Sequence, residues 1–341
     1  MNISKIVKFG VIGLVTGALA GFAGADQERT SLVHDILSET DRASFLDDSS
    51  SATVNVHGFT QFRWTYNNVN TDGVDSTHGF SVPRTRLEIS GNLYNWDYVV
   101  SGQWDDGDSF TLKDAYANLG KFQVGQFKSP FMKEVLTSST DTLATERSVV
   151  SNQFGQGRSQ GLQYSRDMRF GTFTSAYTDG FNTSNGAGVQ NGYALTSRVD
   201  FDVNSWTRAG IAVSHNDLDT TTYNTWTADA TFSAVEFDIN GAYVATSDDD
   251  WGTVWTASYE CTDKMQGFVQ YENGHLDGVD TNLSIVTVGV NYALDKNVKW
   301  TTDLGKSLDD IDSGWDLSNS GWNTTASDGE LLLRSQVQVT F

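Results

Sequence analysis

The chain has 341 residues, a formal net charge of −21 and a single cysteine, Cys261. The acidity excludes nucleic acid as a partner, because the sequence has no basic patch for phosphate groups. One cysteine excludes a scaffold of intramolecular disulfides, and an aromatic content of 12% is not that of a disordered chain.

The first 25 residues have the pattern of a secretory signal peptide. Lys5 and Lys8 precede an apolar stretch, and Ala23-Gly24-Ala25 forms an A-x-A cleavage site. An uncleaved membrane anchor is the alternative, although the apolar stretch is short for a spanning helix. We expect residues 1–25 to be removed and the mature chain to begin near Asp26.

Residues 26–50 are predicted to form a short periplasmic amphipathic helix. Leu32, Val33, Ile36 and Leu37 recur at helical spacing, and Ser31 is a suitable N-cap. Short isolated helices are marginal in water, so three roles stay open. The segment is an oligomerisation helix, a plug at one mouth of the following domain, or a linker without a role.

From residue 51 to the C-terminus the hydrophobic period changes to two, which is typical of β-strands with one apolar face. The last strand shows it: Leu333, Val337, Val339 and Phe341 alternate with polar residues. About sixteen strands are predicted, at 53–66, 80–91, 96–105, 111–119, 121–128, 159–166, 169–179, 193–203, 206–215, 222–232, 234–245, 251–260, 264–272, 282–293, 298–305 and 330–341.

The loops between these strands alternate between long and tight connections, and aromatic residues gather at the ends of the apolar faces. Both features are typical of a bacterial outer-membrane barrel, with short periplasmic turns and longer external loops. The predicted fold class is therefore all-β: a transmembrane antiparallel β-barrel over 51–341, in the outer membrane of a Gram-negative-type bacterium. The last strand must pair with the first, because lipid cannot satisfy an open strand edge.

The connection at 129–158 is too long for an ordinary loop and carries Lys133, Glu134, Arg147 and Arg158. A sixteen-stranded barrel is wide enough to hold water, so a loop folded into the lumen narrows the channel. The alternative is an external loop that only covers the surface. We also expect the acidic runs "TSDDDW" and "SLDDIDSGWD" to be solvated external charge, with a bridging divalent cation as the alternative.

Four stretches, "PRTRLEISGNL", "LKDAYANL", "FQVGQFKSPFMKEVLTSSTDTLATERSVV" and "GRSQGLQYS", resemble the phosphate-selective porin O and P family. The likeness is closest to its branch in planctomycete-like bacteria and covers about residues 55–185. It implies a homotrimeric, sixteen-stranded general or anion-preferring porin. In this family the third long connection, here 129–158, is folded into the pore.

Charge is unevenly distributed along the chain. Eleven basic and twelve acidic residues lie between His57 and Arg169, whereas seven basic and twenty-four acidic residues follow. Alternation turns the predicted wall charges toward the lumen, because a charge at the lipid midplane costs about 2–4 kcal/mol. The predicted lumen and constriction residues are Arg63, Arg84, Arg86, Glu88, Lys133, Glu134, Arg147, Arg158 and Arg334. The arginines either select ions or simply pair with lumen carboxylates.

No catalytic constellation or metal-ligand spacing is present in the sequence, so we expect neither enzymatic activity nor a cofactor. The predicted function is passive diffusion of small hydrophilic solutes and ions. The alternatives are a phosphate- or anion-selective porin and a structural or adhesive outer-membrane barrel. The C-terminal Phe341 resembles the signal that the outer-membrane barrel assembly machinery recognises.

Overall fold

The computed structural model describes residues 53–68, 70, 75–105, 110–184, 192–217, 222–312, 314–318, 320–322 and 328–341. The predicted signal peptide and the helix predicted at 26–50 lie outside these residues. The described part contains sixteen strands and three short helices, α3 (Lys133–Leu136), α4 (Val149–Phe154) and η1 (Asp277–Val279). No helix in this part is both long enough and apolar enough to span a membrane.

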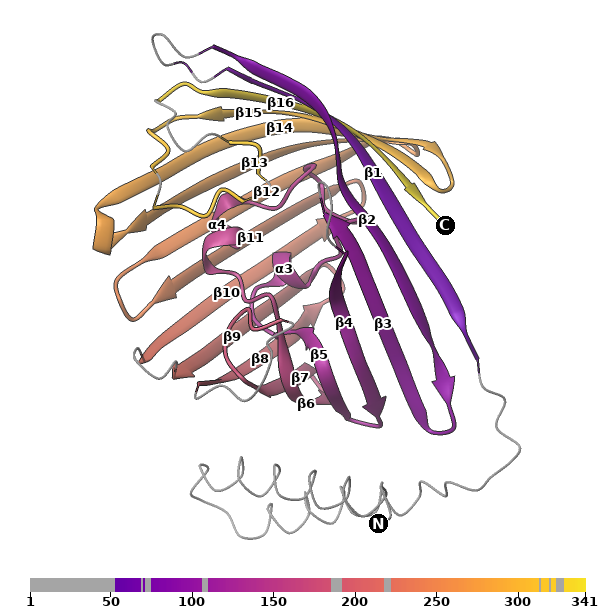
Figure 1. The fold of residues 1–341 in the computed structure, drawn as a ribbon. Coiled ribbons are helices and arrows are strands. Elements are labelled where there is room, and N and C mark those ends of the chain that lie inside the picture. Colours follow the sequence, from indigo (N-terminus) through magenta and orange to yellow (C-terminus); the bar gives the residue numbers. More distant parts are fainter. Residues whose placement is uncertain are drawn as a thin grey trace.

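The strands form one closed antiparallel barrel, in which each strand pairs with its neighbours in sequence and β1 pairs with β16 (Figure 1). The predicted fold class is confirmed. The strands are β1 (Asn55–Asn68), β2 (Thr77–Leu93), β3 (Trp96–Asp105), β4 (Phe110–Leu119), β5 (Phe122–Lys128), β6 (Arg158–Met168), β7 (Gly171–Thr178), β8 (Tyr193–Asn204), β9 (Thr207–Asp217), β10 (Thr222–Ala234), β11 (Phe237–Thr246), β12 (Trp251–Thr262), β13 (Met265–Leu276), β14 (Thr281–Asp295), β15 (Val298–Ser307) and β16 (Leu331–Thr340).

The period of two sorts the side chains between lipid and lumen. On β1, Phe62 is 50% exposed, whereas Gln61 and Arg63 on either side of it are at most 5% exposed. The outer surface carries large exposed apolar side chains, such as Trp255 and Tyr259 on β12. An outer surface of this kind is typical of a barrel in a bilayer, so the polar side chains that alternate with the apolar ones face the lumen.

Seven two-residue turns join the strands at the barrel end that holds the start of β1 and the end of β16. The longer connections lie at the opposite end, which makes the short-turn end the periplasmic one. Most predicted strand boundaries agree with the structure within three residues, and several predicted strand residues lie in turns. Val235 was predicted in a strand at 234–245, but it forms the turn before β11 with φ 46° and is fully exposed. Such a left-handed residue is typical of the favoured two-residue hairpin turns, and Tyr94 and Gly120 provide it in two other turns of this barrel.

The seam of the barrel joins β1 to β16 over ten residue pairs, from Phe59–Thr340 to Asn68–Leu331. Phe341 extends it by two backbone bonds of 2.9 Å, one donated by its N–H to Gly58 O and one accepted from the Gly58 N–H. A Cβ atom at Gly58 would lie 2.4 Å from the Phe341 ring. Glycine at this position therefore lets the last side chain close over the first strand.

Candidate functional site: the lumen and its loop

Residues 129–157, between β5 and β6, lie inside the barrel with α3 and α4 (Figure 1). Three wall side chains from two strands, β14 and β15, bind the backbone of this segment. The Thr145 N–H donates to Asp303 Oδ2 at 2.7 Å, and Asn291 Nδ2 donates to Leu143 O at 3.0 Å. Lys299 Nζ donates to Thr140 O at 2.6 Å. The inward faces of β14 and β15 therefore hold the loop backbone.

Glu146 joins this loop to the opposite side of the seam. Its two carboxylate oxygens lie 2.6 Å from Arg63 and 2.5 Å from Arg84, and both Glu146 and Arg63 are buried. Arg63 also donates to Thr145 O at 3.1 Å and to Gln336 on β16. Burial alone would raise the pKa of Glu146, but the attraction of Arg84 and Arg63 outweighs it and lowers the pKa.

Two further carboxylates hold the start of α4. Glu134 accepts hydrogen bonds from the Ser148 N–H at 2.8 Å and from Ser148 Oγ at 2.6 Å. Glu272, on β13, accepts the Val149 N–H at 2.6 Å. Free N–H groups at a helix start need such acceptors when they are buried. Ser148 is itself the N-cap, so the helix start is satisfied from the loop and from the wall.

A basic group of side chains faces the loop from the β2–β6 wall. Arg158 binds Asp114 through two bonds of 2.8 and 2.7 Å, and Lys128 Nζ donates to the Leu136 and Thr137 carbonyls. Arg86 donates to Gln103 Oε1 at 2.9 Å. The charged side chains that line the cavity here, of about 280 Å³, are Arg86, Glu88, Asp114, Lys128 and Arg158. Cations outnumber carboxylates by three to two in this lining.

The other side of the loop has the opposite balance. A cavity of about 220 Å³ lies between the loop and β10–β13, and its charged lining residues are Lys133, Glu134, Asp141, Glu146 and Asp229. Lys133 Nζ donates to Thr231 Oγ1 on β10. One cation therefore stands against four carboxylates, so the loop separates a basic side of the lumen from an acidic side.

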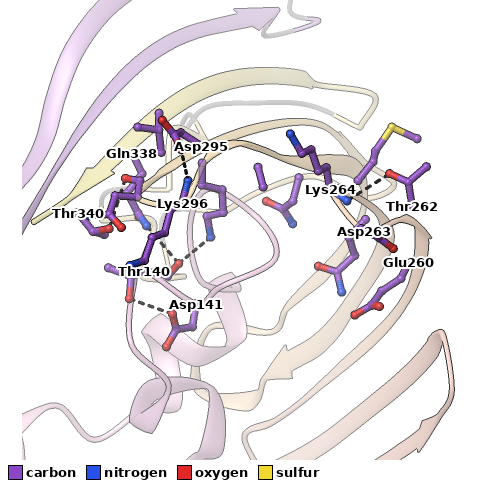
Figure 2. Close-up of a pocket in the computed structure, with 17 residues that line it drawn as sticks. Thr140, Asp141, Glu260, Thr262, Asp263, Lys264, Asp295, Lys296, Gln338 and Thr340 are labelled. Atoms are coloured by element: carbon purple, nitrogen blue, oxygen red, sulfur yellow. Dashed lines mark hydrogen bonds between the residues drawn. The ribbon is translucent and has the colours of Figure 1, made fainter.

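A third cavity, of about 430 Å³, lies at the short-turn end and is shown in Figure 2. Loop residues Thr140 and Asp141 form part of its lining, together with residues of the turns between β12 and β13 and between β14 and β15. Its charges are mixed: Asp141, Glu260, Asp263, Asp295, Lys264, Lys296 and Lys299. Asp141 also lines the acidic-side cavity, so both spaces lie against this loop residue.

Two further predicted site residues, Arg334 and Arg147, are bound to loop backbone. Arg334 is 4% exposed, binds Asp303 at 2.7 Å and donates to Ser320 O at 2.7 Å. Arg147 donates to Glu134 O at 3.0 Å and to Thr137 O at 2.6 Å within the loop. Burial lowers the pKa of Arg147. Of the predicted residues, Arg86, Glu88 and Arg158 line the basic-side cavity, while Arg63, Arg84, Arg147 and Arg334 bind the loops.

Sequence reasoning missed Asp114 and Lys128. The pairing of β3 with β4 shifts register between Val100 and Gly102, so simple alternation misplaces the residues around Asp114. Lys128 is the last residue of β5 and its side chain turns to the loop. A lysine directly before the long loop was the only available signal.

We expected the two acidic runs to be solvated external charge. This holds for several of their aspartates but not for the tryptophan in the second run. Asp248, Asp249, Asp310 and Asp312 are exposed, whereas Trp315 is 3% exposed. The described residues contain no group of three or more histidine, cysteine or acidic side chains placed to hold a metal ion.

Comparison with known proteins agrees with this architecture. The family model of phosphate-selective porin O and P matches residues 54–254, which is more than half of the chain. The chain belongs to the phosphate-selective porin O and P family. The match extends well beyond residue 185, where the resemblance in the sequence ended. Membership makes this chain an outer-membrane porin, a channel for passive diffusion.

Solved structures share the fold at low identity. An anion-selective porin from Comamonas acidovorans is 13% identical, with a TM-score of 0.60 over 85% of this porin and 100% of that chain. The DcaP channel of Acinetobacter baumannii is 13% identical, with a TM-score of 0.63 over 86% and 99%. Salmonella typhi OmpF, in complex with daunomycin, is 13% identical, with a TM-score of 0.64 over 84% and 97%. None of the curated protein sequences compared matches this porin.

Proposed function

We propose that this porin passes small hydrophilic solutes through the basic side of its lumen, and that the loop at 129–157 sets the constriction. The observation that carries the proposal is the buried Glu146 clamp, which binds Arg63 and Arg84 at 2.6 and 2.5 Å. A loop held by a charged pair in the interior is fixed in place, since breaking such a pair costs about 3–5 kcal/mol. A fixed loop defines a constant pore size.

In this proposal the site residues divide into two sets. Arg86, Glu88, Arg158 and Lys128 contact the solute path, with Asp114 as the partner of Arg158. Arg63, Arg84, Glu146 and Arg334 position the loops. The transport step involves no covalent chemistry, so we propose no enzymatic activity.

Single-channel recording in a planar bilayer tests the proposal. Purified porin is expected to give ohmic steps whose size falls when Gln123, in the basic-side lining, is replaced by tryptophan. Gln266→Trp, in the wide cavity at the short-turn end, is the matched control and is expected to leave the steps nearly unchanged. Absence of ohmic steps from folded porin would exclude the channel.

A preference for anions is the second candidate. Arg86 donates to an uncharged acceptor, the side-chain oxygen of Gln103, so its charge is available to a passing anion. The family name adds phosphate as the ion to test first. Reversal potentials in a salt gradient decide, and a clear cation preference would contradict this candidate. Phosphate block of the chloride current would narrow it to phosphate.

We also propose that the porin is a homotrimer and that its assembly uses Phe341 as the signal for the barrel assembly machinery. One similar structure, OmpT of Vibrio cholerae, is described as a trimer form. The apolar outer surface supplies area for contact with lipid and with further copies. The mass of the porin in native electrophoresis and after cross-linking checks the trimer. A structural or adhesive role predicts a lumen without cavities, which the three lumen spaces argue against.

A further inference from the structure

An apolar cluster lies inside the barrel, where a porin lumen is ordinarily polar. Phe154 of α4 packs edge-on against Trp315, with ring centroids 6.1 Å apart. Trp322 belongs to the same buried cluster, as do three inward-facing wall residues, Leu283, Ile285 and Leu332. The described residues 314–318 therefore lie against α4, where Trp315 contacts Phe154, and Trp322 extends the same cluster.

Three glycines on the wall make room for this cluster. A Cβ at Gly274 would lie 2.6 Å from the Trp315 ring, and one at Gly305 would lie 2.7 Å from the Trp322 ring. A Cβ at Gly252 would lie 2.6 Å from Val150 of α4. These distances are far below van der Waals contact, so β12, β13 and β15 are shaped to receive the tryptophans and the helix.

Polar bonds fix the same segment in position. The Asp316 N–H donates to Gln153 Oε1 at 2.8 Å, and Asn152 Nδ2 donates to Ser318 O at 3.2 Å, so α4 holds it on one side. Arg334 donates to Ser320 O at 2.7 Å from the wall. Asn67 Nδ2, on β1, donates to Gly321 O at 3.0 Å. A solvated external loop would not need these contacts.

The cluster borders the acidic-side cavity. Ala242 and Val254 line that cavity, Val254 is part of the cluster and Ala242 packs against it. Asp141 lines both this cavity and the short-turn cavity. The apolar cluster thus borders the acidic side, and Trp315 and Trp322 come from the β15–β16 connection at the external end of the barrel.

We propose that Trp315, Trp322 and α4 form a fixed plug that closes the acidic side of the lumen at its external end. This rests on the proposed function, because it assigns the solute path to the basic side by closing the other side. The charge selectivity of the porin then depends on residues that never contact the solute. Loss of the plug opens a second path lined by Glu134, Asp141 and Asp229.

Substitutions on the plug and on its seats test this. The double variant Trp315→Ser/Trp322→Ser and the single variant Gly274→Val are expected to raise single-channel conductance roughly up to twofold, because parallel paths add. The cation-to-anion permeability ratio is expected to rise as well. The matched controls are Gly267→Val, on the same strand, where a Cβ would meet only the Cys261 sulfur at 3.8 Å, and Trp255→Ser, on the outer face.

Thiol accessibility gives a second readout that tolerates small changes in folding. In a Cys261→Ser background, Thr256→Cys places a thiol in the acidic-side cavity and Gln123→Cys places one in the basic-side cavity. A charged thiol reagent applied from the external side of a bilayer-inserted porin is expected to modify Gln123→Cys at least tenfold faster. Adding Gly274→Val is expected to remove that difference.

The outcomes separate the two ideas. Heat-modifiable gel mobility shows that a plug variant still forms a folded barrel. If such a variant has unchanged conductance and selectivity, the plug is overturned and the porin function stays intact. Equal external modification of both thiols with the plug intact would also overturn it. Absence of conductance in the unmodified porin would overturn the proposed function together with the plug.

Discussion

The wall at β2–β4 and the wall at β14–β16 share the same alternation of inward and outward residues, but their inward faces differ in chemistry. On β2–β4 the inward side chains include Arg86, Glu88 and Asp114, and a water-accessible space lies beside them. On β14 and β16 the inward side chains include Leu283, Ile285 and Leu332, all fully buried under the loops. Alternation decides only which face is inward. The residue types on that face decide whether the lumen holds water or packed side chains.

The difference teaches that a porin lumen is partly a protein core. Polar interiors of barrels hold water because charged side chains keep their hydration. Where aliphatic residues and glycines replace them, the loops supply the missing apolar partners. The packed half then supports the loop that borders the open half, so the two halves are mechanically linked through Glu146.

The largest expected effect comes from breaking that link. Glu146→Ala removes the carboxylate that Arg63 and Arg84 share and leaves Arg63 buried beside Arg84, at a cost of about 3–5 kcal/mol. We expect loop 129–157 to become sensitive to protease and the open-channel current to become noisy. Glu260→Ala, exposed on the same lumen, is the control. A quiet, protease-resistant loop in the Glu146 variant would disprove the clamp.

Truncation of apolar side chains compares the halves directly. Leu332→Ala in the packed half is expected to destabilise the folded barrel by about 2–5 kcal/mol, because it leaves a cavity among buried side chains. Val99→Ala, at the lining of the open side, is expected to cost much less. Urea unfolding in detergent micelles measures both. Similar costs for the two variants would mean that the halves are equally packed.

The seam between the halves is tested at the C-terminus. Deletion of Phe341 removes two backbone bonds to Gly58 and, as we propose, the assembly signal. We expect several-fold less assembled trimer in the membrane, with unchanged conductance for the molecules that do assemble. Phe341→Tyr keeps the ring and the backbone and serves as the control. Normal assembly of the truncated chain would count against the signal.

The smallest effect is expected from mild acid. Because the pKa of Glu146 is lower in the folded porin than its ordinary value of about 4.3, its ionised form stabilises the fold at and above that value. This stabilisation is lost only as the pH falls through the lowered folded pKa. Current noise is therefore expected to stay constant from pH 7 to pH 5 and to rise in stronger acid. Glu146→Gln should lack this acid step, and a step already present above pH 5 would contradict the assignment.

Much of the fold was predictable because strand signals are local. The predicted strand at 96–105 coincides with β3, and most other boundaries agree within three residues. The error at Val235 arose because a turn can continue an apolar alternation that the backbone does not follow. The inward placement of Arg63, Arg84 and Arg86 was also readable from alternation.

The partners of those arginines were not readable. Glu146 is 83 residues from Arg63 in the chain, and Trp315 meets Phe154 only after both loops have entered the lumen. Such contacts depend on how two loops share one interior, and period-two patterns carry no information about that. The glycines at 252, 274 and 305 were a signal of close approach, but the sequence does not say what approaches them.

The seam between β1 and β16 determines when the barrel can close. Gln61 and Gln338 bond across it although 277 residues separate them in the chain. Every other neighbouring strand pair is sequential, so it can form as a hairpin while later parts are still being exported. Closure alone must wait for β16, whose partner β1 lies at the other end of the strand order. Until that pairing forms, the sheet has two open edges whose backbone groups lipid cannot satisfy.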